Sequence, residues 1–166
     1  MKKLFILLLL INLCVQAQNI AYVDSRYILE KIPEFNTAQE ELNNVSLEWQ
    51  EEIDMLKEEV ERLYQKYQAE QYLLPEETKR SREEIIIQKE KEIKAITKQR
   101  FGPDGELYKK QDQLIKPIQD LIYGAIADFA EKGKYDIILD KSSDLIMLFA
   151  NQELNKSDEI LEKLGY

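Results

Sequence analysis

The longest pattern in the sequence is a narrow apolar stripe between Asn36 and Leu73, a stretch without proline or glycine. Apolar residues recur there mostly at steps of three and four positions, which is the periodicity of a coiled-coil seam. One step of eight residues, from Val45 to Ile53, indicates a shift of register. Most other positions are polar or charged, so a helix with this pattern needs a partner helix to cover its stripe.

A second charged helical pattern follows directly, over Glu76 to Phe101, with isoleucines on one side of it. The dipeptide Leu74-Pro75 supplies a turn, with proline at the first helical position and acids behind it. Two long helices joined by so short a turn run antiparallel, so the sequence predicts a helical hairpin. The seam between its arms is predicted at Leu42, Trp49, Leu56, Leu63, Ile86 and Ile93.

The two arms of this hairpin differ in charge. The outgoing arm, 36–74, carries ten acids and three bases, whereas the return arm, 75–101, carries six acids and eight bases. Ion pairs that flank a coiled-coil seam select partner and orientation, which favours electrostatic matching of the arms. The alternative is a solvated charged face, on which each pair contributes little to stability.

The return arm is interrupted at 101–105, where the sequence reads Phe-Gly-Pro-Asp-Gly. With Leu73 paired to Glu76, the register places Phe101 near Trp49, the largest apolar side chain of the outgoing arm. The interruption is either a hinge or a looped-out insertion that keeps the register. The sequence does not separate these two alternatives.

The two ends of the chain mix short strands with helices. Residues 19–24 alternate enough for a strand, after which Asp24 or Ser25 caps a short helix over 26–32. The return helix resumes at 106 with a wider apolar stripe and runs to about 131; Pro117 inside it can kink a helix. Gly133 is expected to end it.

The last third of the sequence predicts two strands and a helix. Residues 135–140 are rich in β-branched and aromatic residues, and the continuous apolar run 145–149 predicts a strand buried on both faces. Ser157-Asp158 is expected to cap a helix that ends at Leu164, with Gly165 beyond it.

The predicted fold class is therefore α+β, with a long antiparallel coiled-coil hairpin (36–105) that projects from a small β-strand body (18–35 and 106–166). A body of roughly 80 residues is small for independent stability, so oligomerisation is expected to supply further burial. Core or subunit-interface positions are expected at Ile20, Tyr22, Ile118, Ile122, Phe129, Ile137, Leu139, Ile146, Leu148 and Phe149.

Residues 1–17 have the features of a cleavable secretory signal peptide. Lys2 and Lys3 precede a short apolar run, and Val15-Gln16-Ala17 resembles a cleavage site. The run is too short to span a bilayer, so no membrane span is expected. A buried helix is the structural alternative, and a lipid anchor at Cys14 is a weaker one because bulky Leu13 precedes it. The sequence thus predicts an exported protein.

The composition leaves little room for catalysis. Histidine is absent, which removes Ser-His and Cys-His pairs and His-ligated zinc, and a single cysteine cannot form an internal disulfide. A net charge of −9 argues against nucleic-acid binding. Asp24 and Asp140 stand at strand ends, where capping is the expected role. We therefore expect no enzyme activity, no cofactor and no metal site.

Three segments resemble the Skp/OmpH family of periplasmic chaperones. The first is the opening strand and helix, from Ile20-Ala-Tyr-Val-Asp-Ser25 to Ile28-Leu29. The second runs from Pro117-Ile118 to Gly133-Lys-Tyr-Asp-Ile-Ile-Leu-Asp140, and the third is the terminal Ser157-Asp-Glu-Ile-Leu161 with Leu164-Gly165. The arms between them match only in length and heptad character.

This resemblance implies a periplasmic homotrimer, in some settings associated with the outer membrane. Its strands would form a central β-body, and its hairpins would enclose a cavity that holds unfolded outer-membrane proteins without ATP. The sequence has no Gly-rich phosphate loop, which agrees with an ATP-independent mechanism. The acidic net charge of this chain departs from the family pattern, because the best-studied members of the family are basic.

A chaperone that holds unfolded chains needs dispersed apolar contacts on an otherwise soluble surface. The candidates are apolar arm residues that lie off the seam: Met55, Tyr64, Tyr72, Leu73, Leu74, Ile85 and Ile87. The structural alternative is that these residues only cover the seam or pack against the tip. The alternative function is a non-catalytic coiled-coil adaptor that binds one folded partner of the cell envelope.

Overall fold

The computed structural model describes residues 18–143 and 146–166, which form two compact units. One unit comprises 18–32 and 119–166 and contains both strands; the other, 33–118, contains the long helices. The predicted signal peptide, with Cys14, lies outside the described residues. In the part that the structure describes, every helix is too short or too polar to cross a bilayer.

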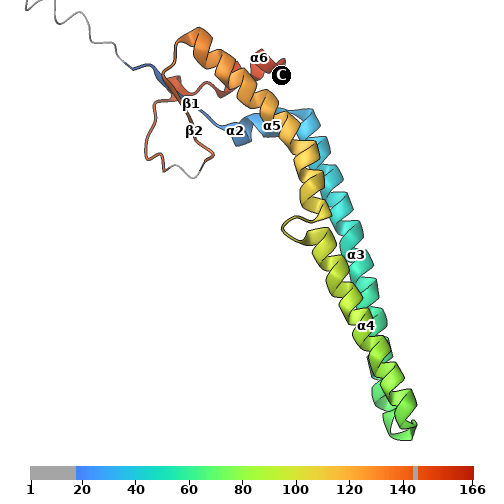
Figure 1. Cartoon of the computed structure of the whole chain (residues 1–166). Coiled ribbons are helices and arrows are strands. Elements are labelled where there is room, and N and C mark those ends of the chain that lie inside the picture. The colour runs from blue at the N-terminus through green and yellow to red at the C-terminus, as the bar shows by residue number, and fades with distance from the viewer. Residues whose placement is uncertain (1–17, 144–145) are drawn as a thin grey trace, which may run out of the picture. The chain divides into compact units, whose positions relative to one another are not determined.

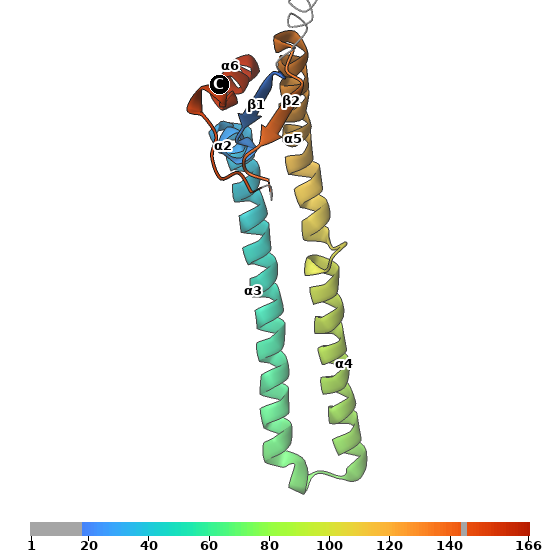
Figure 2. The same ribbon diagram turned by 90° about the vertical axis from the view of Figure 1, so that its left-hand side faces the viewer.

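The helical unit is a hairpin of two antiparallel helices (Figures 1 and 2). The outgoing helix, α3, spans Pro33–Glu70, and the return helix, α4, spans Glu76–Phe101. A 3₁₀ turn, η2, covers Gln71–Leu73 at the tip. The helix α3 starts three residues before the predicted Asn36, because proline is tolerated in the first turn of a helix and does not interrupt it there.

The interruption after Phe101 has the geometry of a looped-out insertion. The next helix, α5, spans Glu106–Gly133 and continues through Pro117. Trp49 meets the Phe101 ring edge-on before the interruption, with 6.3 Å between ring centroids, and beyond it Leu42 is buried with Ile115. The return chain therefore stays on the seam side of α3 on both sides of the loop.

The contact of Leu42 with Ile115 also places the end of the arm later in the sequence than predicted. The predicted arm ended at 105, whereas the compact hairpin unit extends to 118. The reason is a buried cluster of Ala38, Leu42 and Ile115, against which Phe35 and Ile118 also pack. The first half of α5 thus belongs to the hairpin.

The strand-containing unit is built around a two-stranded parallel sheet. Strand β1 (Ile20–Val23) pairs with β2 (Ile137–Asp140) in register, so that Ile20 lies beside Ile137. On the other side of β1, the Tyr22 carbonyl accepts a hydrogen bond of 2.9 Å from the Lys156 amide. Residues from both ends of the chain are therefore held together by backbone hydrogen bonds.

Short helices cover this sheet. Helix α2 (Ser25–Lys31) is capped by Asp24, whose Oδ1 accepts from the Tyr27 amide at 3.0 Å, as predicted. Helix α6 (Ser157–Leu164) ends at Gly165 in the left-handed conformation, also as predicted. The core of the unit is formed by residues with 7% or less of their surface exposed: Ala21, Tyr22, Val23, Ile28, Ile32, Ile122, Ala125, Ile160 and Leu161.

The predicted strand at 145–149 is wrong for residues 146–149, and Leu145 lies outside the described residues. Residues 146–149 are irregular, and the side chains of Ile146, Leu148 and Phe149 are 85 to 94% exposed. The described residues provide neither a neighbouring strand nor a covering layer for this run. Without such a partner, apolar content alone does not make a strand.

Two capping predictions also need correction. Gly133 is still helical, and Lys134 takes the left-handed conformation that ends α5. Gly133 is small for another reason, because a Cβ there would lie 2.5 Å from the Tyr135 ring. Ser157 is the first residue of α6, where its hydroxyl donates to Asn155 at 2.7 Å and accepts from the Asp24 amide at 2.8 Å.

Candidate functional site: the surface of the helical arm

The seam of the hairpin is thin. Ile53 is the most deeply buried residue of the arm, with 1% of its surface exposed, although the step of eight before it breaks the simple heptad pattern. Of the residues predicted for the seam, Leu42 and Ile86 are buried. The other four are half-buried: Trp49, Leu56, Leu63 and Ile93.

One flank of the seam is closed by ion pairs between the arms. Lys89 of α4 lies 2.9 Å from Glu59 of α3, and near the tip Arg82 lies 2.6 Å from Glu70. The hydrogen bond to Lys89 lowers the pKa of Glu59 below its ordinary value. Electrostatic matching of an acidic outgoing arm with a more basic return arm, as predicted, is therefore present as named contacts.

Arg100 gathers several contacts where α4 ends. Its guanidinium lies 4.4 Å from the centroid of the Trp49 ring and pairs with Glu106 across the loop. Glu52 of α3 is 3.8 Å away. The hydrogen bond from Gln99 and then that from Arg100 lower the pKa of Glu106. The loop is thus held by a cation stacked on an aromatic ring and by two carboxylates.

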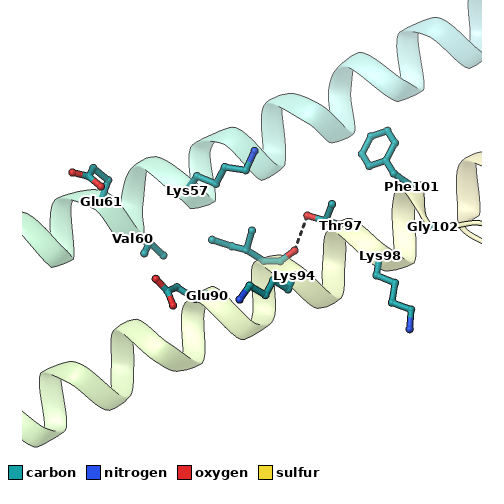
Figure 3. Close-up of a pocket in the computed structure, with 10 residues that line it drawn as sticks. Lys57, Val60, Glu61, Glu90, Lys94, Thr97, Lys98, Phe101 and Gly102 are labelled. Atoms are coloured by element: carbon teal, nitrogen blue, oxygen red, sulfur yellow. Dashed lines mark hydrogen bonds between the residues drawn. The ribbon is translucent and has the colours of Figure 1, made fainter.

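The opposite flank of the seam is open. A groove of about 660 Å³ lies there between α3 and α4 (Figure 3), and neither Glu59 nor Lys89 lines it. On the closed flank the space beside Glu59 and Lys89 is only about 10 Å³, and nearer the tip the space beside Arg82 is about 230 Å³. The groove is lined by Val60, Ile93 and Phe101 with Thr97, and by the charged residues Lys57, Glu61, Glu90, Lys94 and Lys98.

The predicted client-binding residues lie on the arm surface. Tyr72 and Leu73 at the tip are 87% and 86% exposed, and Leu74 is half-buried. The remaining four are exposed along the two helices: Met55, Tyr64, Ile85 and Ile87. Leu47 and Tyr108, which are 62% and 57% exposed, were not predicted from the sequence. Their position off the apolar stripe is the signal that could have found them.

The residues predicted for the core or the subunit interface divide into three groups. Tyr22 and Ile122 are buried in the single chain, and Ile118, Phe129 and Leu139 are half-buried. Ile20 and Ile137, paired across the sheet, are 37% and 45% exposed. The third group is the exposed apolar segment, defined here as 146–149, whose large apolar side chains other than Met147 are almost fully exposed.

Among the described residues, no group of three or more histidine, cysteine, aspartate or glutamate side chains is placed to hold a metal ion. What the arm offers instead is exposed apolar side chains separated by charges.

Comparison with known proteins decides the family. A family model described as outer membrane protein (OmpH-like) matches residues 19–164. The chain belongs to the OmpH-like family. Its fold also resembles a crystal structure from Caulobacter crescentus, of a protein assigned as an OmpH-like outer membrane chaperone. A search of curated proteins found no match to the sequence.

The likeness to the OmpH-like protein of Caulobacter crescentus is one of fold. The TM-score is 0.69, and the alignment covers 90% of this chain and 85% of the other. Sequence identity is only 10%. The two chains thus share a fold although only 10% of the residues are identical.

Proposed function

We propose that this OmpH-like protein is an ATP-independent holdase of the periplasm that binds unfolded outer-membrane β-barrel proteins on its helical arms. The observation that carries the proposal is the exposure of Tyr72 and Leu73 at the tip, with Met55, Tyr64 and Ile85 along the arm. Large apolar side chains this exposed mark interaction surfaces. The charges between them keep the arm soluble.

The scattered arrangement of these residues favours unfolded clients over one folded partner. A partner-specific interface has a contiguous apolar core with a polar rim. On the arm, acids and bases separate the exposed apolar residues, and the tip pair stands alone. Many weak contacts on several arms add by effective concentration without requiring one client sequence.

We further propose that three copies associate through the strand-containing unit. The support is the exposed apolar segment 146–149, together with the half-exposed pair Ile20 and Ile137. Leu148, at 94% exposure, is the most exposed large apolar residue of the described chain. The native mass by light scattering should be three times that of the monomer. A monomeric mass would leave this segment uncovered and contradict the assembly.

The function is tested by the aggregation of an unfolded outer-membrane barrel protein diluted from urea. We expect wild-type protein to suppress the light scattering without ATP. Tyr72→Ser/Leu73→Ser should require several-fold more protein for the same suppression, because a principal apolar contact is lost. Gln65→Ser/Gln68→Ser, on exposed polar positions near the tip, is the matched control and should behave as wild type. Aggregation unchanged by wild-type protein would refute the proposal.

A further inference from the structure

The two flanks of the arm seam differ in a way that the coiled-coil pattern does not require. On the closed flank, Glu59 and Lys89 bridge the helices. On the open flank, no ion pair between the arms is found within the hairpin unit 33–118, and Lys94 and Lys98 lack a carboxylate within 4.0 Å. A groove with an apolar floor and unpaired cations is left there.

Particular residues mark both ends of this groove. Towards the tip, the Tyr67 hydroxyl donates a hydrogen bond to Glu83 and so bridges the two helices. Towards the loop, Phe101 and Gly102 end the groove (Figure 3). The part of α4 that lines it, from Glu90 to Phe101, is about 17 Å long at 1.5 Å per residue. An extended peptide of about five residues has the same length.

The floor of the groove is apolar. Val60 of α3 and Ile93 of α4 both line it. Phe101 lies at its loop end (Figure 3). Thr97 adds its methyl group, because its hydroxyl donates to the Ile93 carbonyl at 2.7 Å and is therefore already satisfied. Such a floor takes apolar side chains from one face of an extended segment, while the other face stays in water.

Charges are separated along the length of the groove. The two acids, Glu61 and Glu90, lie at its tip end (Figure 3). Lys94 and Lys98 follow Glu90 by one and two helical turns towards the loop. Opposite them, Lys57 is already paired with Asp54 at 2.8 Å. An incoming segment with an acidic end therefore gains contacts at the loop end and meets repulsion at the tip end.

We propose that this groove binds an extended client segment of about five residues, with alternating apolar side chains and an acidic end directed to Lys94 and Lys98. This inference rests on the proposed chaperone function and names the client feature that the arm selects. Strands of outer-membrane barrels alternate apolar and polar residues, so their unfolded segments offer one apolar face of the required spacing. The open flank then binds the client segment, and the ion pairs of the closed flank hold the two helices together.

The charge part of the proposal is tested with two fluorescent peptides that share the core Val-Thr-Phe-Thr-Leu. Both peptides carry lysine at one end of this core. At the other end, one peptide carries glutamate and the second carries lysine. Wild-type protein should prefer the glutamate peptide. Lys94→Glu/Lys98→Glu should weaken binding of the glutamate peptide by roughly tenfold and reverse the preference, since two exposed charge contacts change sign.

Matched controls separate the groove from general charge and from folding. Arg80→Glu/Lys91→Glu changes the net charge equally, on exposed positions of α4 that do not line the groove, and should keep the wild-type preference. Thr97→Trp fills the groove and should abolish binding of both peptides. Glu92→Trp, on the closed flank, should bind as wild type. The helical circular dichroism of each variant verifies folding.

The outcomes also separate this proposal from the chaperone function. If wild-type protein suppresses barrel aggregation but Thr97→Trp binds peptide as tightly as wild type, the groove proposal is overturned and the chaperone function stands. An unchanged preference in Lys94→Glu/Lys98→Glu would overturn the charge selection. If wild-type protein fails to suppress aggregation, the chaperone function falls, and the groove as a client site falls with it.

Discussion

The helical hairpin and the strand-containing unit differ in how many apolar side chains they bury. The hairpin buries few large side chains, chiefly Ile53, Ile86 and the cluster around Leu42, and leaves most of its surface in water. The strand-containing unit joins residues more than 110 positions apart and fully buries Ile28 and Ile160. A thin arm exposes the most surface per residue, which suits binding, whereas the compact unit holds the chain ends.

The largest effect on stability is expected at Ile160, which has no exposed surface. Ile160→Ala leaves a cavity in the core of the strand-containing unit, so it should lower the free energy of unfolding by about 3 kcal/mol. Chemical denaturation measures the loss. Leu154→Ala, at a position 41% exposed, is the control and should cost far less. Equal losses would show that this unit lacks a compact core.

A smaller loss is expected in the arm. Ile53→Ala should cost about 2 kcal/mol, because the two helices can close part of the space over a seam that is one residue deep. Helical circular dichroism during denaturation follows the arm. Leu47→Ala, at a position 62% exposed on the same helix, should leave the midpoint almost unchanged. A loss at Ile53 larger than that at Ile160 would reverse the comparison between the units.

The strand-containing unit should also depend on pH through Asp140. Partial burial raises the pKa of this carboxyl, but hydrogen bonds from the side chains and amides of Ser25 and Ser142 outweigh burial and lower the pKa below its ordinary value. The folded pKa is thus below the unfolded one, so the contribution is complete above the unfolded pKa, about 4. It is lost as the pH falls through the folded pKa.

Replacement of this group tests the assignment. Asp140→Asn should cost about 1 kcal/mol at neutral pH and should flatten the acid limb of the stability curve. Thermal unfolding between neutral pH and about pH 3 measures both. Asp120→Asn, on an exposed position of α5, is the control. An acid limb in Asp140→Asn identical to that of wild type would contradict the role of Asp140.

The smallest effect is expected from the ion pairs on the closed flank. Glu59→Lys should lower the thermal midpoint of the arm slightly, because the 2.9 Å contact with Lys89 becomes a repulsion. Adding Lys89→Glu should restore the midpoint, and salt at about 1 M should erase both changes. If the double reversal failed to restore stability, the charges on this flank would not act as a pair.

The sequence predicted the hairpin well because a coiled-coil seam is a local and periodic signal. The helix bounds at Glu76 and Phe101 follow from the prolines and glycines beside them, and the approach of Phe101 to Trp49 follows from the register. The charge complementarity follows from the acid and base counts of the two arms. The groove could not be predicted, since heptad spacing identifies seam residues without showing which flank is left open. It depends on short Thr97 and on the absence of an ion pair there.

The strand-containing unit was predicted less completely because its contacts are not local. Strands at 20–23 and 137–140 were found from alternation and from β-branched and aromatic content, but the apolar run that also predicted a strand is irregular over 146–149. Whether such a run forms a strand depends on a partner that its own sequence does not specify. Lys134, in place of Gly133, takes the left-handed position, and the Tyr135 ring lies against Gly133.

The central claim is that the arms hold unfolded chains, and it is tested most directly by presenting one outer-membrane barrel protein in two states. Fluorescence anisotropy would compare the affinity of this chain for the urea-unfolded barrel, freshly diluted, with that for the same barrel folded in detergent micelles. We expect binding of the unfolded barrel and at least tenfold weaker binding of the folded one. Equal or tighter binding of the folded barrel would contradict the holdase and support an adaptor for a folded partner.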